Sequence, residues 1–131
     1  MPMPYASINP DALRQAIGFG AYFESAQQAI TPSGTLTIPH LLGRKPFLIS
    51  VTAICITNDG NFSAGDERDV SFTSESTALT NDFGLGINRT STHLIVSIAS
   101  NATPILAVDP VTFTAIGLTN ANWMLIFRAL G

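Results

Sequence analysis

From Gly34 onward, short stretches of alternating or largely apolar residues are separated by turn residues, and no helical pattern comes between them. These stretches lie at residues 35–38, 47–57, 69–73, 84–88, 93–99, 105–108, 111–114 and 122–129. A period of two is typical of strands with one buried face, and strands without intervening helices argue against a parallel sheet. We therefore expect residues 34–131 to form an all-β domain, an antiparallel, jelly-roll-like β-sandwich of seven or eight strands.

Residues 1–33 have a different character, with prolines spread through them and one helical pattern. Asn9 is suited to an N-cap and Pro10 to the first helical position, and an apolar stripe follows before Gly18. We expect an N-terminal arm with a short helix, continued by a second helical turn or an extended segment over residues 21–29. The arm should attach the domain to another protein through its large apolar residues, Tyr5, Leu13, Ile17, Phe19, Tyr22 and Phe23.

Charged residues make up only 11% of the chain and hydrophobic residues 46%, with a net charge of −3. Soluble domains average about 25% charged residues, so part of this surface should be buried against other chains. Apart from Arg44-Lys45 the basic residues are scattered, which argues against nucleic-acid binding and against a polybasic membrane anchor. No apolar stretch approaches the ~20 residues of a membrane span, and the N-terminus does not resemble a secretory signal.

The sequence offers little catalytic chemistry. Cys55 lies in an apolar run and is best read as a buried structural thiol. The two histidines, His40 and His93, have no nucleophile elbow to serve, because the chain lacks a Gly-x-Ser-x-Gly motif. Trp123 is expected to anchor the last strand in the core rather than to stack on a sugar. We expect no enzymatic activity and no cofactor.

The most polar segment is the loop over residues 58–69. Asp59, Asn61, Ser63 and Asp66 carry oxygens that suit calcium, although their spacing does not match an EF-hand. A solvated loop with an Asp-Arg pair is the simpler interpretation. The same loop is a candidate receptor-binding loop through Asp59, Asn61, Asp66 and Glu67, as are residues 74–83 and 100–104.

Three ordered segments resemble a module of tailed-bacteriophage tail fibres and related virion appendages. Residues 35–46 are similar to a strand that leads into a Pro-His-Gly-Leu-Gly turn, with Leu41 where the family usually has glycine. Residues 62–70 are similar to its Tyr-Ser-x-Gly-Asp-Glu segment, and residues 118–129 to its Asn-Trp-x-Leu-x-x-Arg-Ala ending. The resemblance covers about residues 34–130 and leaves the arm outside it.

This resemblance implies a compact β-sandwich, commonly a homotrimer, that is displayed on the virion and has no catalytic residues. Family modules usually follow a long shaft, which this chain does not show. We therefore expect a capsid decoration or cement protein, a head fibre or a short knob, attached by its arm to a major capsid, tail or adaptor protein. The alternative is a tail-fibre tip that acts as a receptor- or glycan-binding knob. A bacterial surface glycan is one ligand that such a knob would bind. An enzyme is the third and least supported hypothesis.

Overall fold

A computed structural model describes residues 21–70, 73–74 and 82–131, and this part of the chain forms an all-β, antiparallel structure. Its strands are β1 (Tyr22–Glu24), β2 (Gln28–Ala29), β3 (Thr35–Pro39), β4 (Leu48–Cys55), β5 (Glu67–Asp69), β6 (Thr73–Ser74), β7 (Phe83–Arg89), β8 (His93–Ile98), β9 (Leu106–Val108), β10 (Ala115–Gly117) and β11 (Trp123–Leu130). A 3-10 turn, η2 (Asn120–Asn122), precedes β11. The all-β, antiparallel expectation is thus confirmed, whereas the helix expected over residues 9–17 lies outside the described residues.

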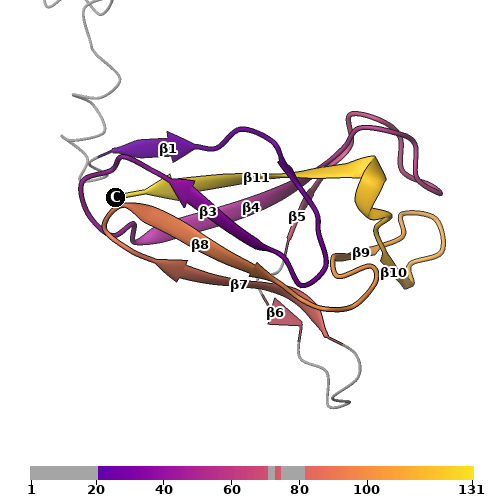
Figure 1. The fold of residues 1–131 in the computed structure, drawn as a ribbon. Coiled ribbons are helices and arrows are strands. Elements are labelled where there is room, and N and C mark those ends of the chain that lie inside the picture. The colour runs from indigo at the N-terminus through magenta and orange to yellow at the C-terminus, as the bar shows by residue number, and fades with distance from the viewer. Residues whose placement is uncertain (1–20, 71–72, 75–81) are drawn as a thin grey trace, which may run out of the picture.

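Two main sheets are stacked in layers (Figure 1). Sheet A has the order β1-β11-β4-β5, with β2 also paired to β11, and sheet B has the order β3-β8-β7-β6. The remaining pair, β9 and β10, forms a hairpin at one end of the layers, next to η2, and Gly131 lies at the other end. The long axis of the molecule therefore has two different ends.

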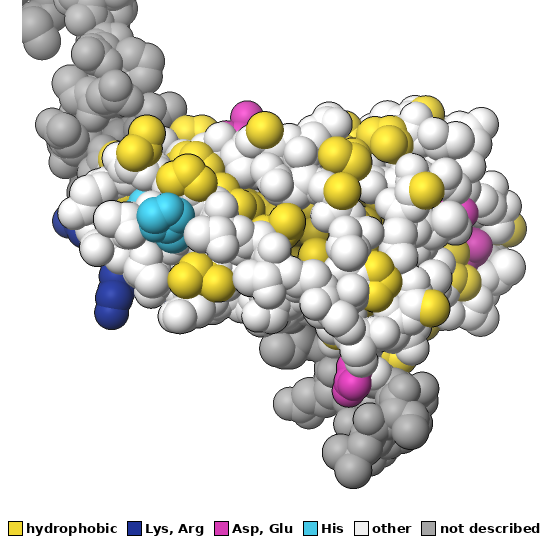
Figure 2. Space-filling model, in the orientation of Figure 1, with side chains coloured by type: hydrophobic (Ala, Val, Ile, Leu, Met, Phe, Trp, Pro, Cys, Tyr) yellow, Lys and Arg dark blue, Asp and Glu magenta, His cyan; other side chains and the backbone are white. Residues whose placement is uncertain are grey.

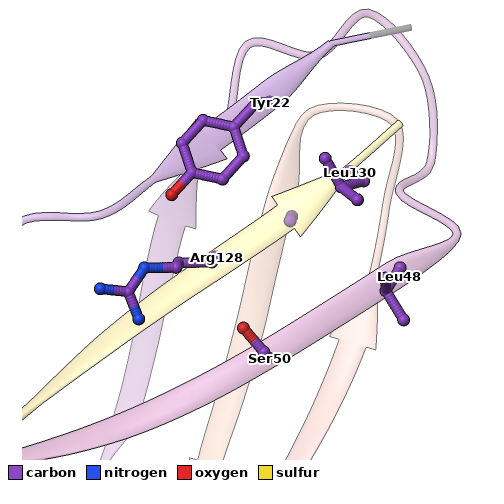
Figure 3. Close-up of a pocket in the computed structure, with 6 residues that line it drawn as sticks. Tyr22, Leu48, Ser50, Arg128 and Leu130 are labelled. Atoms are coloured by element: carbon purple, nitrogen blue, oxygen red, sulfur yellow. The ribbon is translucent and has the colours of Figure 1, made fainter. Parts of the chain in front are cut away.

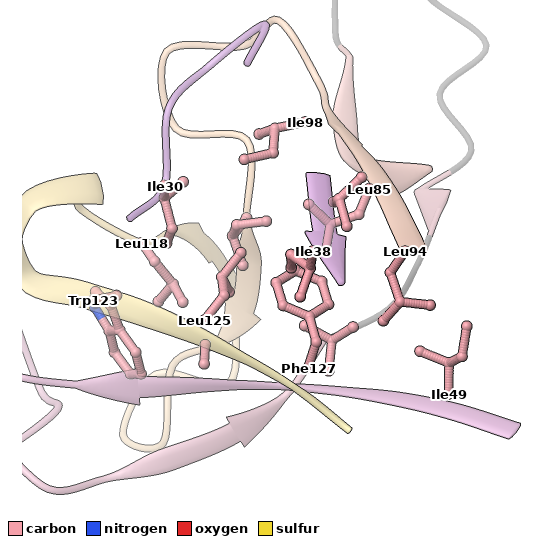
Figure 4. Close-up of a cluster of buried hydrophobic side chains, with 14 of the residues drawn as sticks. Ile30, Ile38, Ile49, Leu85, Leu94, Ile98, Leu118, Trp123, Leu125 and Phe127 are labelled. Carbon is pink, nitrogen blue, oxygen red and sulfur yellow. The ribbon is translucent and has the colours of Figure 1, made fainter. Parts of the chain in front are cut away.

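The core lies between the sheets (Figure 4). β11 is fully paired with β4 and places every second side chain on the inner face, where Trp123, Leu125 and Phe127 are each 0% exposed. Sheet B covers them with buried side chains of β3, β7 and β8, namely Ile38, Leu85, Leu94, Val96 and Ile98. Full burial of one such side chain contributes about 1.5–3 kcal/mol, so this layer-to-layer contact is the main source of stability.

Cys55, at the end of β4, is buried as the sequence predicted. Its Sγ donates to the carbonyl oxygen of Thr57 at 3.1 Å. Burial raises the pKa of the Cys55 thiol, which keeps it in the unreactive protonated form. This environment fits a structural residue.

Residues 22–30, which the sequence assigned to the arm, belong to sheet A. β1 pairs with the last residues of β11, β2 pairs with its first half, and Ile30 lies in the core. The helical alternative for residues 21–29 is therefore wrong, and the extended one is correct. The inward side chain of Phe23 explains this, because it packs edge-on against His40 with ring centroids 6.4 Å apart.

Two short strands differ from the sequence expectation. The strand expected at residues 111–114 is a turn, and the pairing segment is β10, at residues 115–117. The strand expected at 69–73 instead begins earlier, as β5, where Glu67 pairs with Ile54. At residues 111–114 the backbone N–H groups of Val111 and Thr112 donate to the Asp109 side chain, and strand periodicity does not report such bonds.

The turn after β3 contains the first segment of the virion-module resemblance. The His40 side chain is buried, and its Nδ1 accepts a hydrogen bond from the Leu42 backbone N–H at 3.1 Å. Its Nε2 therefore carries the proton that is donated to the Thr90 carbonyl oxygen at 2.9 Å. Between these anchored residues Leu41 has φ 54° and is 93% exposed. The position thus has the left-handed backbone that favours glycine, and Leu41 occupies it without packing.

Candidate binding surface at the loop end

The loop after β4 is fixed to the start of β11 by the carboxylate of Asp59. Its Oδ2 accepts hydrogen bonds from the Trp123 indole Nε1 at 2.8 Å and from the Thr119 backbone N–H at 2.9 Å. Its Oδ1 accepts from the Thr119 hydroxyl at 2.9 Å. Burial raises the pKa of Asp59, but the bonds from Thr119 and Trp123 outweigh it and hold the pKa below its ordinary value of 3.8. Asp59 is therefore a structural anion.

The rest of this loop is ordered by further short contacts. Asp66 Oδ2 accepts from the Ser63 backbone N–H at 2.8 Å, and Asn58 Oδ1 accepts from the Ala64 backbone N–H at 2.8 Å. The Phe62 ring lies edge-on to Trp123 at 5.1 Å between centroids. The guanidinium of Arg68 sits 5.0 Å above the same Phe62 ring, a cation-π contact in place of the Asp-Arg pair expected for this loop.

A second loop, residues 109–114, is held by the carboxylate of Asp109, which is only 6% exposed. Asp109 Oδ1 accepts from the backbone N–H groups of Val111 at 2.8 Å and Thr112 at 3.0 Å. The Asn61 side-chain Nδ2 lies 3.0 Å from both Asp109 carboxylate oxygens. The bonds from Thr112 and Val111 lower the pKa of Asp109, with a further contribution from Asn61. Asn61 and Asp109 thus join the two loops into one rigid unit.

The second loop displays apolar side chains to solvent at residues 110–113, which we call the 110–113 tip. Phe113 is 80% exposed and Val111 is 64% exposed. Phe113 also has φ 60°, a left-handed conformation that is unfavourable for an aromatic residue. Its backbone N–H donates to the Asp109 carbonyl oxygen at 3.0 Å, which holds it in place. An aromatic ring fixed in solvent on a strained backbone stabilises the fold little, and such positions are typical of binding surfaces.

The four residues proposed as a receptor loop are not brought together. Asp59, Asn61 and Asp66 point to different partners inside the loops, and Glu67 lies on β5. Within the described ranges, 21–70, 73–74 and 82–131, no group of three or more His, Cys, Asp or Glu side chains is placed to hold a metal ion. Of the side chains considered for calcium, the carboxylates of Asp59 and Asp66 serve as acceptors within the loops themselves.

The sequence did not single out Asp109 or the 110–113 tip. The signal was present in Asp109-Pro110, a turn-forming pair, followed by Val111 and Phe113. The apolar residues within 111–114 were instead predicted to form a strand. The candidate loop at 100–104 does lie at this end, where the Asn120 amide donates to the Ala102 carbonyl oxygen at 2.8 Å. Most of the candidate loop at 74–83 lies outside the described residues.

Of the predicted arm contacts, Tyr22 and Phe23 are described, and they point to opposite faces of β1. Phe23 faces the core, whereas Tyr22 lies on the outer face of sheet A (Figure 3). There it lines a shallow, mainly apolar pocket of about 140 Å³ with Leu48, Leu130, Ser50 and Arg128. Tyr5, Leu13, Ile17 and Phe19 lie outside the described residues.

Figure 2 shows one side of the molecule, and few charged side chains lie on it. Apolar side chains gather on this side along the band between the two layers. Within the part of the chain that the structure describes, no helix has the length and apolarity to cross a membrane. No protein-family model matches the chain, and no curated protein or solved structure matches it either.

Proposed function

We propose that the chain is a non-enzymatic structural protein of a tailed-bacteriophage virion, displayed on the particle surface as a homo-oligomer, a trimer by resemblance, and attached through its N-terminal arm. Its described part is then a jelly-roll-like β-sandwich made of sheets A and B. The partner at the attachment point is a major capsid protein or a tail or adaptor protein. A capsid decoration protein, a head fibre and a short knob all agree with this proposal.

The observation that carries the proposal is the separation of the two ends of the domain. The backbone N–H of Ala21 donates to the Gly131 carbonyl oxygen at 2.8 Å, so the chain enters sheet A beside the end of β11 (Figure 1). The loops fixed by Asp59 lie at the start of β11, eight residues earlier. At ~3.3 Å per residue this separation is about 25 Å. A domain held at one end and presenting ordered loops at the other suits display on a particle.

The three segments that resemble the virion module support the proposal in a second way. They contain residues on which the described fold makes specific demands: Gly43 with φ 77°, Gly65 with φ 97°, and Trp123 with its bond to Asp59. The second and third segments also meet in space, through Phe62 and Trp123. The resemblance therefore falls on residues that determine local structure rather than on interchangeable surface positions.

The test is to locate the protein on particles. Purified phage particles from the source are probed with an antibody to the protein, beside a variant phage whose copy lacks residues 1–20. We expect the intact protein on particles and the shortened one in the soluble fraction, with Trp123 fluorescence of the shortened protein showing that the domain is folded. An intact protein that is absent from washed particles would contradict the proposal.

The alternative, a receptor-binding knob, is favoured by one observation, the 110–113 tip. Within the tip, the Thr112 hydroxyl bonds to the hydroxyl of Thr114, the residue just after the tip, at 2.8 Å. The tip therefore presents apolar rather than polar groups. In a host-cell binding assay, Phe113→Ala should weaken binding about tenfold, as expected for a central aromatic contact. Val108→Ala, at another exposed apolar position on β9, is the matched control. Full cell binding by both variants would remove this alternative.

A further inference from the structure

The outer faces of the two sheets have opposite chemistry. The outer face of sheet B carries small and polar side chains together with the half-buried Ile95 of β8, the small and polar ones being Thr35, Thr37, Gly86, Asn88 and Ser97. The outer face of sheet A carries large apolar side chains on β1, β11 and β4, namely Tyr22, Leu48, Ile54, Met124, Ile126 and Leu130. An antiparallel sheet with one solvated face normally has a polar outer face, as sheet B does. Sheet A departs from that rule.

β11 shows the departure most clearly. Its burial alternates residue by residue, but its chemistry does not, because Met124, Ile126 and Leu130 alternate with the inward core residues. Apolar residues on both faces are typical of a strand that is covered on both sides. The inner face of β11 is covered by sheet B, whereas in the described residues its outer face is lined only by neighbouring strands of its own sheet.

The charges on this face suit contact with a copy of itself. Arg128 Nε donates to Glu24 Oε1 at 2.7 Å, and Arg128 Nη1 donates to the Thr52 hydroxyl at 2.9 Å. The bond from Arg128 lowers the pKa of Glu24, which stays ionised. One positive and one negative charge therefore lie side by side at the centre, so two copies of the face meet without net repulsion. Glu67 and Asp69, both exposed, lie on β5 at the rim, where charged residues belong in an interface.

The size of the face agrees with an interface that needs additional contacts. β4 and β11, each about 25 Å long, and the shorter β1, β2 and β5, all spaced ~4.8 Å apart, give a face of about 400 Å². A stable interface buries about 800 Å² on each partner. The face thus supplies about half of what a stable contact requires.

We infer that the outer face of sheet A, centred on Met124, Ile126 and Leu130, is the interface through which copies of this chain assemble. The partner is a second copy, because the face is apolar at its centre and the charges there, Glu24 and Arg128, already neutralise each other within one chain. The inference deepens the proposed function by naming the assembly surface. It can nevertheless fail alone, because assembly in solution is measured without particles.

The experiment measures the mass of the full-length protein by light scattering over a wide range of concentration. We expect wild-type protein at a multiple of 13.9 kDa and Ile126→Glu at 13.9 kDa. Ile95→Glu is the matched control, because it makes the same substitution at the half-buried centre of β8 on the outer face of sheet B. It should keep the wild-type mass. Fluorescence of the buried Trp123 reports whether each variant is folded.

A second variant covers the case in which Ile126→Glu does not fold. Leu48→Glu changes a more exposed residue of the same face, 53% exposed beside the Tyr22 pocket, and should also shift the mass to the monomer. The inference is overturned if wild-type protein is monomeric at every concentration, or if the folded sheet A variants keep the wild-type mass. In either case a positive result from the particle experiment would still stand, and another virion protein would have to cover this face.

Discussion

The indole Nε1 of Trp123 donates a hydrogen bond of 2.8 Å to Oδ2 of Asp59, 64 residues earlier in the chain. The same carboxylate binds the Thr119 backbone N–H and hydroxyl. A core side chain of β11 therefore has its polar atom satisfied by a loop residue, and the loop is positioned by the core. This arrangement links the stability of the domain to the geometry of its presented loops.

Replacing Asp59 should destabilise the domain markedly. Asp59→Ala leaves the buried Trp123 N–H and the Thr119 N–H without their acceptor, and we expect the free energy of unfolding to fall by about 2–3 kcal/mol. Urea denaturation followed by Trp123 fluorescence measures it. Asp66→Ala removes one exposed bond, to Ser63, and should cost less than ~1 kcal/mol. Equal losses in the two variants would show that the Trp123 contact is not special.

Below neutral pH, stability should depend on pH only in the acid range. The pKa values of Asp59 and Asp109 are lowered by folding, so the unfolded chain binds more protons at low pH. Their contribution is complete above the ordinary value of 3.8 and is lost as pH falls through the lower folded pKa values. We expect the free energy of unfolding to be level from neutral pH to about 5 and to fall below about 4. Asp59→Asn should reduce this slope, and an unchanged slope in this variant would show that Asp59 is not its source.

Leu41→Gly should stabilise the protein. Leu41 has φ 54° and almost no contacts, so glycine removes the cost of a left-handed backbone at the expense of some unfolded-state entropy. We expect a net gain of about 0.5–1 kcal/mol in thermal or urea unfolding. Thr37→Gly, at an exposed strand position of β3, should instead lose about 1 kcal/mol. A loss in Leu41→Gly would mean that the leucine side chain makes a stabilising contact.

Gly117→Ala should be destabilising because the site has no room for a side chain. A Cβ there would overlap the Thr103 hydroxyl oxygen and lie 2.6 Å from the Thr103 Cβ. We expect a loss of about 1–3 kcal/mol in urea unfolding, partly recovered in the double variant Gly117→Ala/Thr103→Gly. Gly86→Ala on β7 is the control, because nothing lies within 4 Å of its added Cβ. If both glycine variants lost the same amount, backbone entropy rather than overlap would be the cause.

The long strands were predictable because their burial follows their sequence period. β3, β4, β8 and β11 lie within about two residues of the stretches expected for them, and Trp123 and Cys55 are buried as expected. Each of these strands lies against the core, so hydrophobic burial dominates its structure. The candidate surface was harder to predict, because side-chain acceptors such as Asp109 decide its loops, and a single sequence does not show which N–H groups a carboxylate will bind.

For residues 21–29 the sequence left a helical turn and an extended segment open, for a different reason. Residues 22–29 are too short and irregular to show a strand period, and they form strands only because β11 offers them an edge about 100 residues later. Glu24 and Arg128, 104 residues apart, are joined in this way. Local sequence cannot report a partner at that distance.

The position of β11 in sheet A also sets when the protein can fold. β11 lies between β4 and the early strands β1 and β2, so all three lack their β11 partner until residue 130 has been synthesised. The earlier strands leave the ribosome with their apolar faces uncovered, and contacts between such distant segments form slowly. A nascent chain cut short before β11 therefore keeps only the β4–β5 pair of sheet A and lacks the centre of the proposed assembly face. Translation that stops early yields chains for degradation, and only copies carrying the whole of β11 can join an assembly.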